Sequence, residues 1–494
     1  MEPAALTVAP PNRSNRRKFL HAAAAATLSL PSESAWWLGR AVPRQGKNPG
    51  RRPNILLAVS DDQSWMHTGA AGDRLVKTPA FDRVARLGVR FTQAFCCAPS
   101  CTPSRGAILT GQEIWRLEEG ANLFSTLDKK FDVYPDLLEA AGYQVGYTRK
   151  GWGPGLIEPG GRKRNPAGPA YPDFRQFLAS VPGRQPFCFW FGSTDPHRPY
   201  VPGSGSDSGM KIEDVKVPPF LPDVPEVRND ILDYYFAIER FDRQVGEVLG
   251  LLEKAGELEN TLVILTSDNG MPFPRAKCNL YDYGTRMPLA ICWPGRIRGG
   301  RVIDDFIGFT DLAPLILEAA GLKPPPAMTG RSFLDLLTSS QTAALAPQRD
   351  RVCMGRERHS LGRAGGVGYP MRAIRTRDFL YIHNLAPDRW PAGDAPGYFD
   401  IDPSPTKHFI IQNRLAECRR FFQLAFEKRP AEELYDLAKD PDQLSNVAAI
   451  SEYSSVRERL RSELHRQLIL TADPRARGRE ALWDTYPARV PKRG

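Results

Sequence analysis

The sequence lacks the closely spaced cysteine pairs that hold a structural zinc ion or staple a small domain. Its eight cysteines are spread over 494 residues, at positions 96, 97, 101, 188, 278, 292, 353 and 418. That distribution excludes a compact disulfide scaffold, because such domains are short and dense in cysteine. Cys188 and Cys292 lie within apolar runs typical of strands and are predicted to be buried thiols.

The sequence also lacks a recognisable nucleic-acid-binding module, although its formal net charge is +10 and its pI is about 9.2. Much of the positive excess lies near the two ends of the chain, in residues 13–52 and 475–493. The remaining bias favours a small anionic substrate, and no nucleic-acid partner is predicted.

No apolar stretch near the N-terminus is long enough to remain as a membrane span. The run Asn15-Arg16-Arg17-Lys18-Phe19-Leu20 precedes a short alanine-rich segment, a pattern typical of a twin-arginine export signal. Residues 1–48 are therefore predicted to be a signal segment and linker, and the protein to be periplasmic or secreted. A basic tail leading into a short helix is the alternative.

Apolar runs rich in β-branched or aromatic residues alternate with segments that carry apolar residues at helical spacing. The strand-like runs are Ile55–Val59, Phe187–Phe191, Leu262–Thr266 and Pro288–Cys292. The helical segments are Phe81–Leu87, Tyr134–Ala141, Ile231–Ala255 and Leu312–Ala320. This alternation predicts an α/β fold with a large, mostly parallel central sheet covered by helices, and ligands at the carboxyl ends of its strands.

Acidic residues follow two of the predicted strands directly. The run 55–60 leads into Asp61 and Asp62, and the run 261–267 leads into Asp268 and Asn269. Adjacent carboxylates raise one another's pKa unless a cation compensates. Each pair alone is also typical of a helix N-cap or a turn. Together the two pairs favour a hard divalent ion held by oxygen ligands, calcium before magnesium.

A third motif is Cys101-Thr102-Pro103-Ser104-Arg105-Gly106. Taken alone, it is also compatible with a buried loop cysteine before a helix, with Arg105 paired to a carboxylate. The string matches the C-x-P-S-R signature of type I sulfatases, and with the two flanking acidic motifs the chain resembles that family. The resemblance implies an alkaline-phosphatase-like sandwich, with Cys101 oxidised to formylglycine by a formylglycine-generating enzyme or maturase.

The resemblance also implies the residues of an active site. One calcium ion would be bound by Asp61, Asp62, Cys101, Asp268 and Asn269. The catalytic residues would be Cys101, Arg105, Lys150, His197 and Lys277. In the family, a hydroxyl of the hydrated formylglycine attacks sulfur, the two lysines bind sulfate, and the histidine can protonate the leaving atom.

The chain departs from the family at one position. Family members commonly have a histidine two residues after the first lysine, where it takes a proton from the second hydroxyl, but this chain has Trp152 there. His67, His359 and His383 are possible substitutes, none of them supported by spacing.

The resemblance is closest to the heparan N-sulfatase (sulfamidase) branch. Segments that carry it include Asp268–Pro274, Asn279–Thr285, Gly368–Arg372, Ser404–Thr406 and Glu433–Leu437. It implies removal of sulfate from nitrogen or oxygen of a glucosamine-containing saccharide, such as a glycosaminoglycan fragment. Arg356, His359 and Arg372 are candidate substrate contacts. A catalytic domain is expected over residues 49–350 and a smaller α+β domain with a basic tail over 351–494.

Two other functions remain open on the sequence. A phosphatase or phosphonate monoester hydrolase on the same fold would use serine, threonine or an unmodified cysteine as its nucleophile. A catalytically weakened protein that binds sulfated polysaccharide would be consistent with Trp152.

Overall fold

The computed structural model describes residues 50–339, 346–480 and 482–490. The expected signal segment at 1–48 lies outside the described residues. Within those ranges, no helix combines the length and the apolar character that crossing a bilayer requires.

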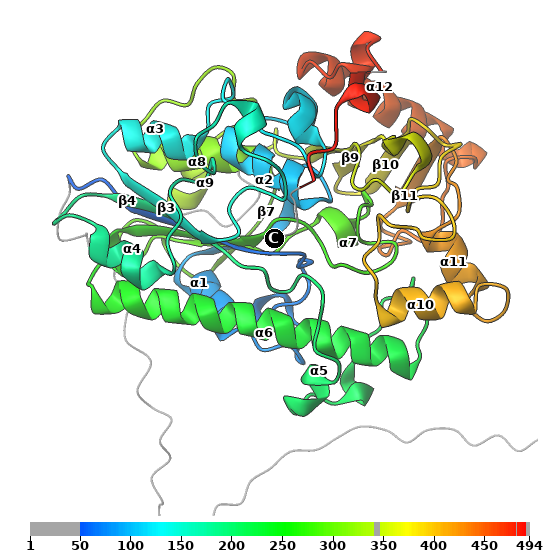
Figure 1. Cartoon of the computed structure of the whole chain (residues 1–494), viewed down its shortest axis with the longest axis horizontal. Helices are drawn as coiled ribbons and strands as arrows, with labels where there is room; N and C mark the ends of the chain where they lie inside the picture. The colour runs from blue at the N-terminus through cyan, green and yellow to red at the C-terminus, as the bar shows by residue number, and fades with distance from the viewer. Residues whose placement is uncertain (1–49, 340–345, 481, 491–494) are drawn as a thin grey trace, which may run out of the picture. The chain divides into compact units, whose positions relative to one another are not determined.

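A seven-stranded sheet lies at the centre of the fold (Figure 1). Its strands, in spatial order, are β3 (Gln144–Arg149), β4 (Phe187–Gly192), β1 (Asn54–Ser60), β5 (Thr261–Ser267), β6 (Leu289–Cys292), β2 (Val89–Phe95) and β7 (Arg301–Gly308). Neighbouring strands are parallel except where β6 pairs with β5 and β2. The mostly parallel sheet predicted from the sequence is therefore confirmed.

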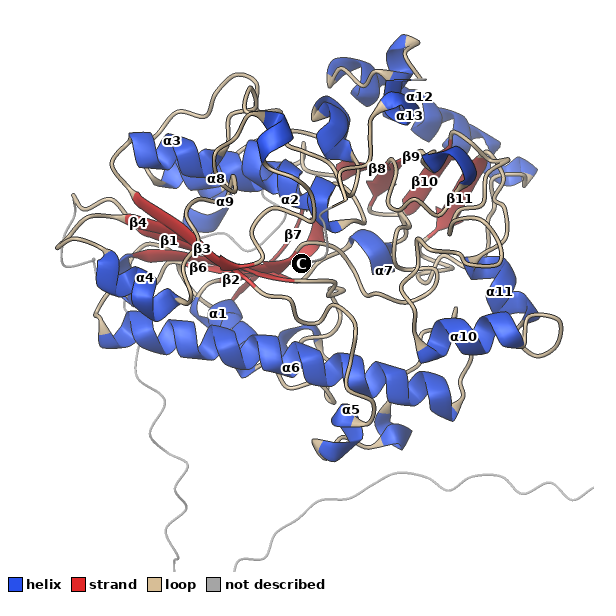
Figure 2. Ribbon diagram, viewed as in Figure 1, coloured by secondary structure: helices blue, strands red, loops and turns tan. Residues whose placement is uncertain are grey.

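Helices cover both faces of this sheet (Figure 2). One face carries α1 (Pro79–Leu87), α4 (Phe174–Ser180) and α6 (Pro225–Lys254), and the other α2 (Cys101–Thr110), α3 (Tyr134–Ala140), α8 (Leu312–Ala319) and α9 (Leu334–Thr338). Strand β1 shows why its sequence is continuously apolar. Ile55, Leu57 and Val59 pack in one core cluster, and Leu56 and Ala58 in a second cluster on the opposite face.

A smaller antiparallel sheet follows along the chain. Its strands, in spatial order, are β11 (Glu432–Asp436), β10 (Phe379–Asn384), β9 (Met371–Thr376) and β8 (Arg351–Arg356). Further helices are α5 (Ser204–Asp207), α7 (Asp282–Thr285), α10 (Pro405–Gln412), α11 (Arg419–Ala425), α12 (Ser454–Leu470) and α13 (Leu482–Thr485). Strand β8 lies beside the segment that follows β2, since Gly355 N donates to Cys97 O at 3.0 Å.

The predicted elements agree with the observed ones within a few residues at most ends. Gly142 and Gly321 stop α3 and α8 with φ values of +86° and +78°, the left-handed conformation expected of C-terminal glycines. Helix α6 begins at Pro225, six residues before the predicted start at Ile231, because proline suits the first turn of a helix. The domain boundary at 350 stays a prediction.

Gly192, the last residue of β4, provides a test of this packing. A Cβ added there would lie 1.7 Å from Lys150 O, which is backbone and cannot move without displacing β3. We expect Gly192→Ala to destabilise the protein by about 1–3 kcal/mol. Gly250, inside α6, has no heavy atom within 4 Å of its added Cβ. Gly250→Ala should instead raise the free energy of unfolding by about 0.8–1 kcal/mol. Urea unfolding measures both variants, and equal changes in the two would contradict the close packing at Gly192.

Candidate active site

The two acidic motifs meet at one edge of the central sheet. Strand β1 ends at Ser60, directly before Asp61 and Asp62, and the neighbouring parallel strand β5 ends directly before Asp268 and Asn269. Asp268 N donates to Ser60 O at 3.1 Å, and Asp62 N donates to Asp268 Oδ1 at 3.1 Å. The parallel register therefore brings all four predicted metal ligands into one buried group.

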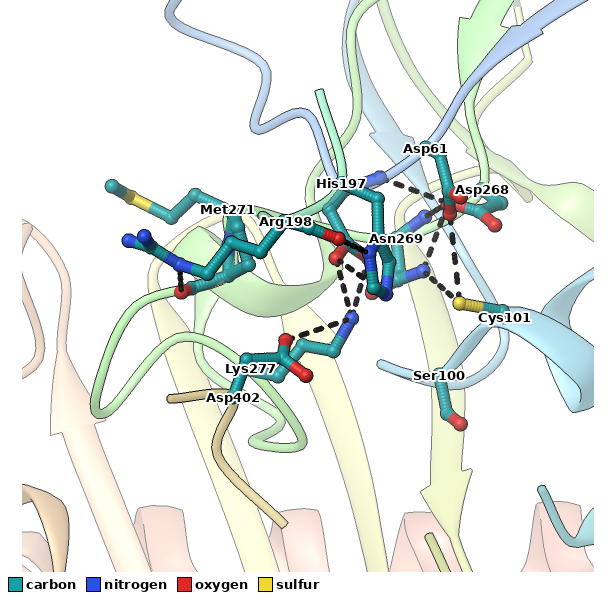
Figure 3. A network of polar contacts seen from close by, with 12 residues as sticks. Asp61, Ser100, Cys101, His197, Arg198, Asp268, Asn269, Met271, Lys277 and Asp402 are labelled. Carbon is teal, nitrogen blue, oxygen red and sulfur yellow. Dashed lines mark hydrogen bonds and ion pairs between the residues drawn. The ribbon is translucent and has the colours of Figure 1, made fainter. Parts of the chain in front are cut away.

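Cys101 is the first residue of α2, a helix whose residues are all buried. Its Sγ lies 3.6 Å from Asp61 Oδ1 and 3.7 Å from Asn269 Nδ2 (Figure 3). Burial raises the pKa of the Cys101 thiol to about 12. At neutral pH the unmodified side chain is therefore a neutral thiol, which is a poor nucleophile.

Arg105 compensates the second acidic motif. Its Nε donates to Asp268 Oδ2 at 2.7 Å, and its Nη1 donates to the carbonyl oxygens of Lys150 and Gly151 at 2.8 and 2.9 Å. The side chains of Arg105 and Asp268 are both fully buried. This guanidinium group thus joins α2, β5 and the loop after β3.

Two lysines compensate the first acidic motif. Lys150 Nζ lies 2.5 Å from Asp61 Oδ2, and Lys277 Nζ lies 2.6 Å from both carboxylate oxygens of Asp62. Burial alone would raise the pKa of Asp61, but Lys150, His197 and Arg105 hold it well below its usual range. Burial raises the pKa of Asp62 to about 6 although Lys277 opposes the shift. Lys277 thus compensates the burial of Asp62 only in part.

The group fits a hard divalent cation. Ligand atoms of Asp61, Asp62 and Cys101 lie within 4.8 Å of one another. Asn269 Oδ1 is buried and accepts no hydrogen bond from the described residues, so it is free to bind a cation. Asp268 adds a further carboxylate, and carboxylate and amide oxygens are the ligands that calcium and magnesium prefer. These acidic residues could therefore hold a metal ion.

His197 and Asp402 lie beside this group (Figure 3). His197 Nε2 is 3.8 Å from Asp62 Oδ2, and the His197 side chain is 34% exposed. Ligand atoms of Asp62, His197 and Asp402 lie within 4.8 Å of one another. Asp402 was not predicted from the sequence; the nearest signal was Ser404–Thr406, which served only to carry the family resemblance.

Two of the candidate substrate contacts have internal partners. Arg356 is buried and donates to Asp400 and to the carbonyl oxygen of Cys278. Arg372 is fully buried between Asp473, at 2.7 Å, and Glu357, also at 2.7 Å. From the sequence, the charges of Arg356 and Arg372 were predicted to be free to contact the substrate. Their guanidinium groups instead tie together segments of the C-terminal part, which argues against substrate contact.

Trp152 stands where the family has a histidine, and it is buried beside α2. A Cβ added to Gly106 would lie 3.7 Å from Trp152 Nε1, so the indole packs close against the helix that carries Cys101. Among the possible substitutes, His67 lies 3.4 Å from Asp73 and packs on Tyr235. His383 pairs across β10 and β9 in the smaller sheet. Neither shows a contact with the site in the described part of the chain.

The fold and these residues together define a hydrolase of the alkaline-phosphatase-like class. Residues 53–154 and 168–322 match the family model described as Sulfatase. Human N-sulphoglucosamine sulphohydrolase is 30% identical over 480 residues, covering 86% of this chain and 91% of the human one. The chain therefore belongs to the sulfatase family, whose members are sulfuric-ester hydrolases, and the resemblance stated from its motifs is confirmed.

Other similar proteins agree with this placement. An ulvan-active sulfatase of Formosa agariphila is 28% identical over 472 residues, covering 85% of this chain and 76% of the relative. A structure solved with its substrate D-glucosamine-2-N,6-O-disulfate has a TM-score of 0.62 at 20% identity, covering 86% and 99%. The phosphonate monoester hydrolase of Agrobacterium radiobacter has a TM-score of 0.62 at 19% identity, covering 86% and 97%. These last two similarities concern the fold alone.

The buried Arg105–Asp268 pair leads to a prediction about stability. Arg105→Ala leaves the Asp268 carboxylate buried without its partner, so we expect a loss of about 3–5 kcal/mol in unfolding free energy. Urea unfolding with a chelator present measures this without compensation by a cation. Arg377→Ala is the matched control, because Arg377 and Asp304 are about half exposed and such pairs contribute about 0–1 kcal/mol. Similar losses of unfolding free energy in both variants would contradict a stabilising role of the buried Arg105–Asp268 pair.

His359 lies against the residue that precedes the helix. Its Nδ1 is 2.8 Å from Ser100 Oγ, and burial lowers the pKa of His359 to about 3. Below about pH 6.5 the unfolded chain binds a proton that folded His359 does not, so this group makes stability fall as the pH falls, by up to about 1.4 kcal/mol per pH unit. Its contribution is therefore fully present above pH 6.5.

We expect His359→Gln to flatten this dependence between pH 7 and pH 5, because glutamine can still bond to Ser100 but does not titrate. Urea unfolding of both proteins at several pH values measures the two slopes. His408→Gln, at an exposed position on α10, should keep the wild-type slope. Parallel profiles for wild type and His359→Gln would show that His359 titrates normally in the folded chain.

Proposed function

We propose that this protein releases sulfate from nitrogen or oxygen of a glucosamine-containing saccharide, with formylglycine at position 101 and one calcium ion. The observation that carries the proposal is the buried contact of Cys101 with Asp61 and Asn269. Lys150 and Lys277 bind the carboxylates of the first acidic motif beside this contact. The human relative named N-sulphoglucosamine sulphohydrolase supports the substrate class. So does the similar fold of a protein solved with a glucosamine disulfate.

The chain's own residues suit this chemistry. Formylglycine would supply a hydroxyl nucleophile in place of an inert thiol, and calcium held by Asp61, Asp62, Asp268 and Asn269 would polarise the sulfate oxygens. Arg105 holds Asp268 and the loop of Lys150 in place, which fixes the geometry around position 101.

Charge matching explains how sulfate would bind. Lys277 presents a buried ammonium group, Lys150 a partly buried one, and His197 adds a partly exposed imidazole. When the bond from sulfur to the saccharide breaks, its electron pair stays on the leaving nitrogen or oxygen. In this proposal His197 would give that atom a proton.

Two further steps belong to the same proposal. Cys101 would be converted by a formylglycine-generating enzyme or maturase. The protein would act in the periplasm or outside the cell after export through its twin-arginine-type signal.

The test is a mass measurement paired with activity. The protein is produced in a host able to convert cysteine to formylglycine, and the Cys101 peptide is analysed. We expect the mass of formylglycine in that peptide, with sulfate release from an aryl sulfate and from D-glucosamine N-sulfate. Cys101→Ala should lower release by at least about 10³-fold, because the nucleophile is lost.

Cys353→Ala is the matched control, because this thiol lies on β8 outside the group of contacts around Cys101. It should keep wild-type activity. Release of phosphate from an aryl phosphate by protein with unmodified cysteine would favour the phosphatase or phosphonate hydrolase function. Binding of sulfated saccharide without release would favour the weakened binding protein that Trp152 suggests.

A further inference from the structure

Asp402 reaches the active site from the C-terminal part of the chain. Its Oδ2 lies 3.9 Å from Lys277 Nζ, beyond hydrogen-bonding distance. Its carboxylate also lies within 4.8 Å of ligand atoms of His197 and Asp62. Figure 3 shows the Asp402 side chain next to Lys277, on the side of that lysine away from Cys101. No part of the mechanism described above uses this carboxylate.

The chain on the N-terminal side of Asp402 is firmly held. Asp400 is fully buried and accepts hydrogen bonds from Arg356, from Arg363 at 2.6 Å, and from Ser360 N at 3.0 Å. The ammonium group of Lys407 donates to Ile401 O at 2.8 Å. These bonds fix the backbone immediately before Asp402.

The chain on the C-terminal side is tied to the loop that carries His197. Arg198, the next residue after His197, binds both carboxylate oxygens of Asp230 at 2.7 and 2.8 Å. Thr406 Oγ1 donates to Asp230 Oδ2 at 2.6 Å. The Asp230 carboxylate therefore fixes the segment of His197 relative to the segment of Asp402, which preorganises the two side chains.

The carboxylate of Asp402 has an unused acceptor. Its Oδ2 is buried and has no hydrogen-bond partner among the described residues, although the side chain as a whole is 26% exposed. Lys277, the nearest cation, directs its hydrogen bonds to Asp62 instead. A buried acceptor without a donor is unfavourable, so a donor from a bound ligand or a water molecule would stabilise it.

The chemistry of the bond to be cleaved indicates which donor would complete it. In a sulfamate the atom that bridges carbon and sulfur is nitrogen, which carries a hydrogen. In a sulfate ester the bridging atom is oxygen, which carries none and would meet the carboxylate lone pair to lone pair. Once protonated further, the leaving amine becomes an ammonium ion, which a carboxylate stabilises more strongly still.

We infer that Asp402 accepts a hydrogen bond from the nitrogen of a sulfamate and so favours N-sulfated over O-sulfated glucosamine. This inference rests on the proposed function and deepens it. Asp402 would contact the leaving nitrogen beside His197, which would protonate that atom. Lys150 and Lys277 would bind the sulfate oxygens.

The test compares two substrates within one preparation. Wild type and Asp402→Asn, both carrying formylglycine, are assayed with D-glucosamine N-sulfate and with 4-nitrophenyl sulfate. Asparagine keeps the shape but loses the charge, so kcat/KM for the N-sulfate should fall about 10- to 100-fold. The value for the aryl sulfate should change less than about threefold, because that substrate has no N–H to offer. Asp402→Ala should show the same selective loss.

Ratios of the two kcat/KM values do not depend on the folded fraction, so a partly unfolded variant still gives an answer. Glu417→Gln removes one exposed negative charge from the same part of the chain and should leave both values unchanged. Parallel losses on both substrates, or no loss on the N-sulfate, would overturn the role of Asp402 while leaving the sulfatase proposal intact. If the wild type released sulfate from neither substrate, the proposed function itself would be wrong.

Discussion

The site depends on the need to neutralise three carboxylates that the fold buries at the ends of two adjacent strands. Asp61, Asp62 and Asp268 cannot remain charged there without nearby cations. The chain supplies those cations from three separate segments: α2, the loop after β3, and the loop after β5. Burial of like charge thus requires long-range contacts, and the same contacts place a cysteine beside a potential metal site.

A further buried charge, Asp230 of α6, extends this arrangement to the C-terminal part. It binds Arg198 on one side and Thr406 on the other. The connection between β10 and α10 therefore brings Asp402 close to Asp62 and His197 and is held there by the contact of Thr406 with Asp230. Residues from both parts of the chain thus meet at the candidate site.

The strand ends could be predicted from the sequence because a buried parallel strand is a continuous apolar run, and the residues after it gather at one edge. Lys150, His197 and Lys277 could be placed only through the family resemblance, since they lie in irregular loops after β3, β4 and β5. Sequence could not identify the internal partners of Arg356 and Arg372, because those carboxylates lie far along the chain. Asp402 could not be predicted either, because it lies far along the chain from the other residues of the site.

The complete burial of α2 limits when position 101 can be altered. Cys101 is 3% exposed, at the first turn of a helix enclosed along its whole length. A separate protein large enough to oxidise a side chain cannot reach a thiol so enclosed without opening the core around it. Any such conversion would therefore have to act on a chain that has not yet closed around this helix, so the timing of folding would limit how much of the protein could be converted.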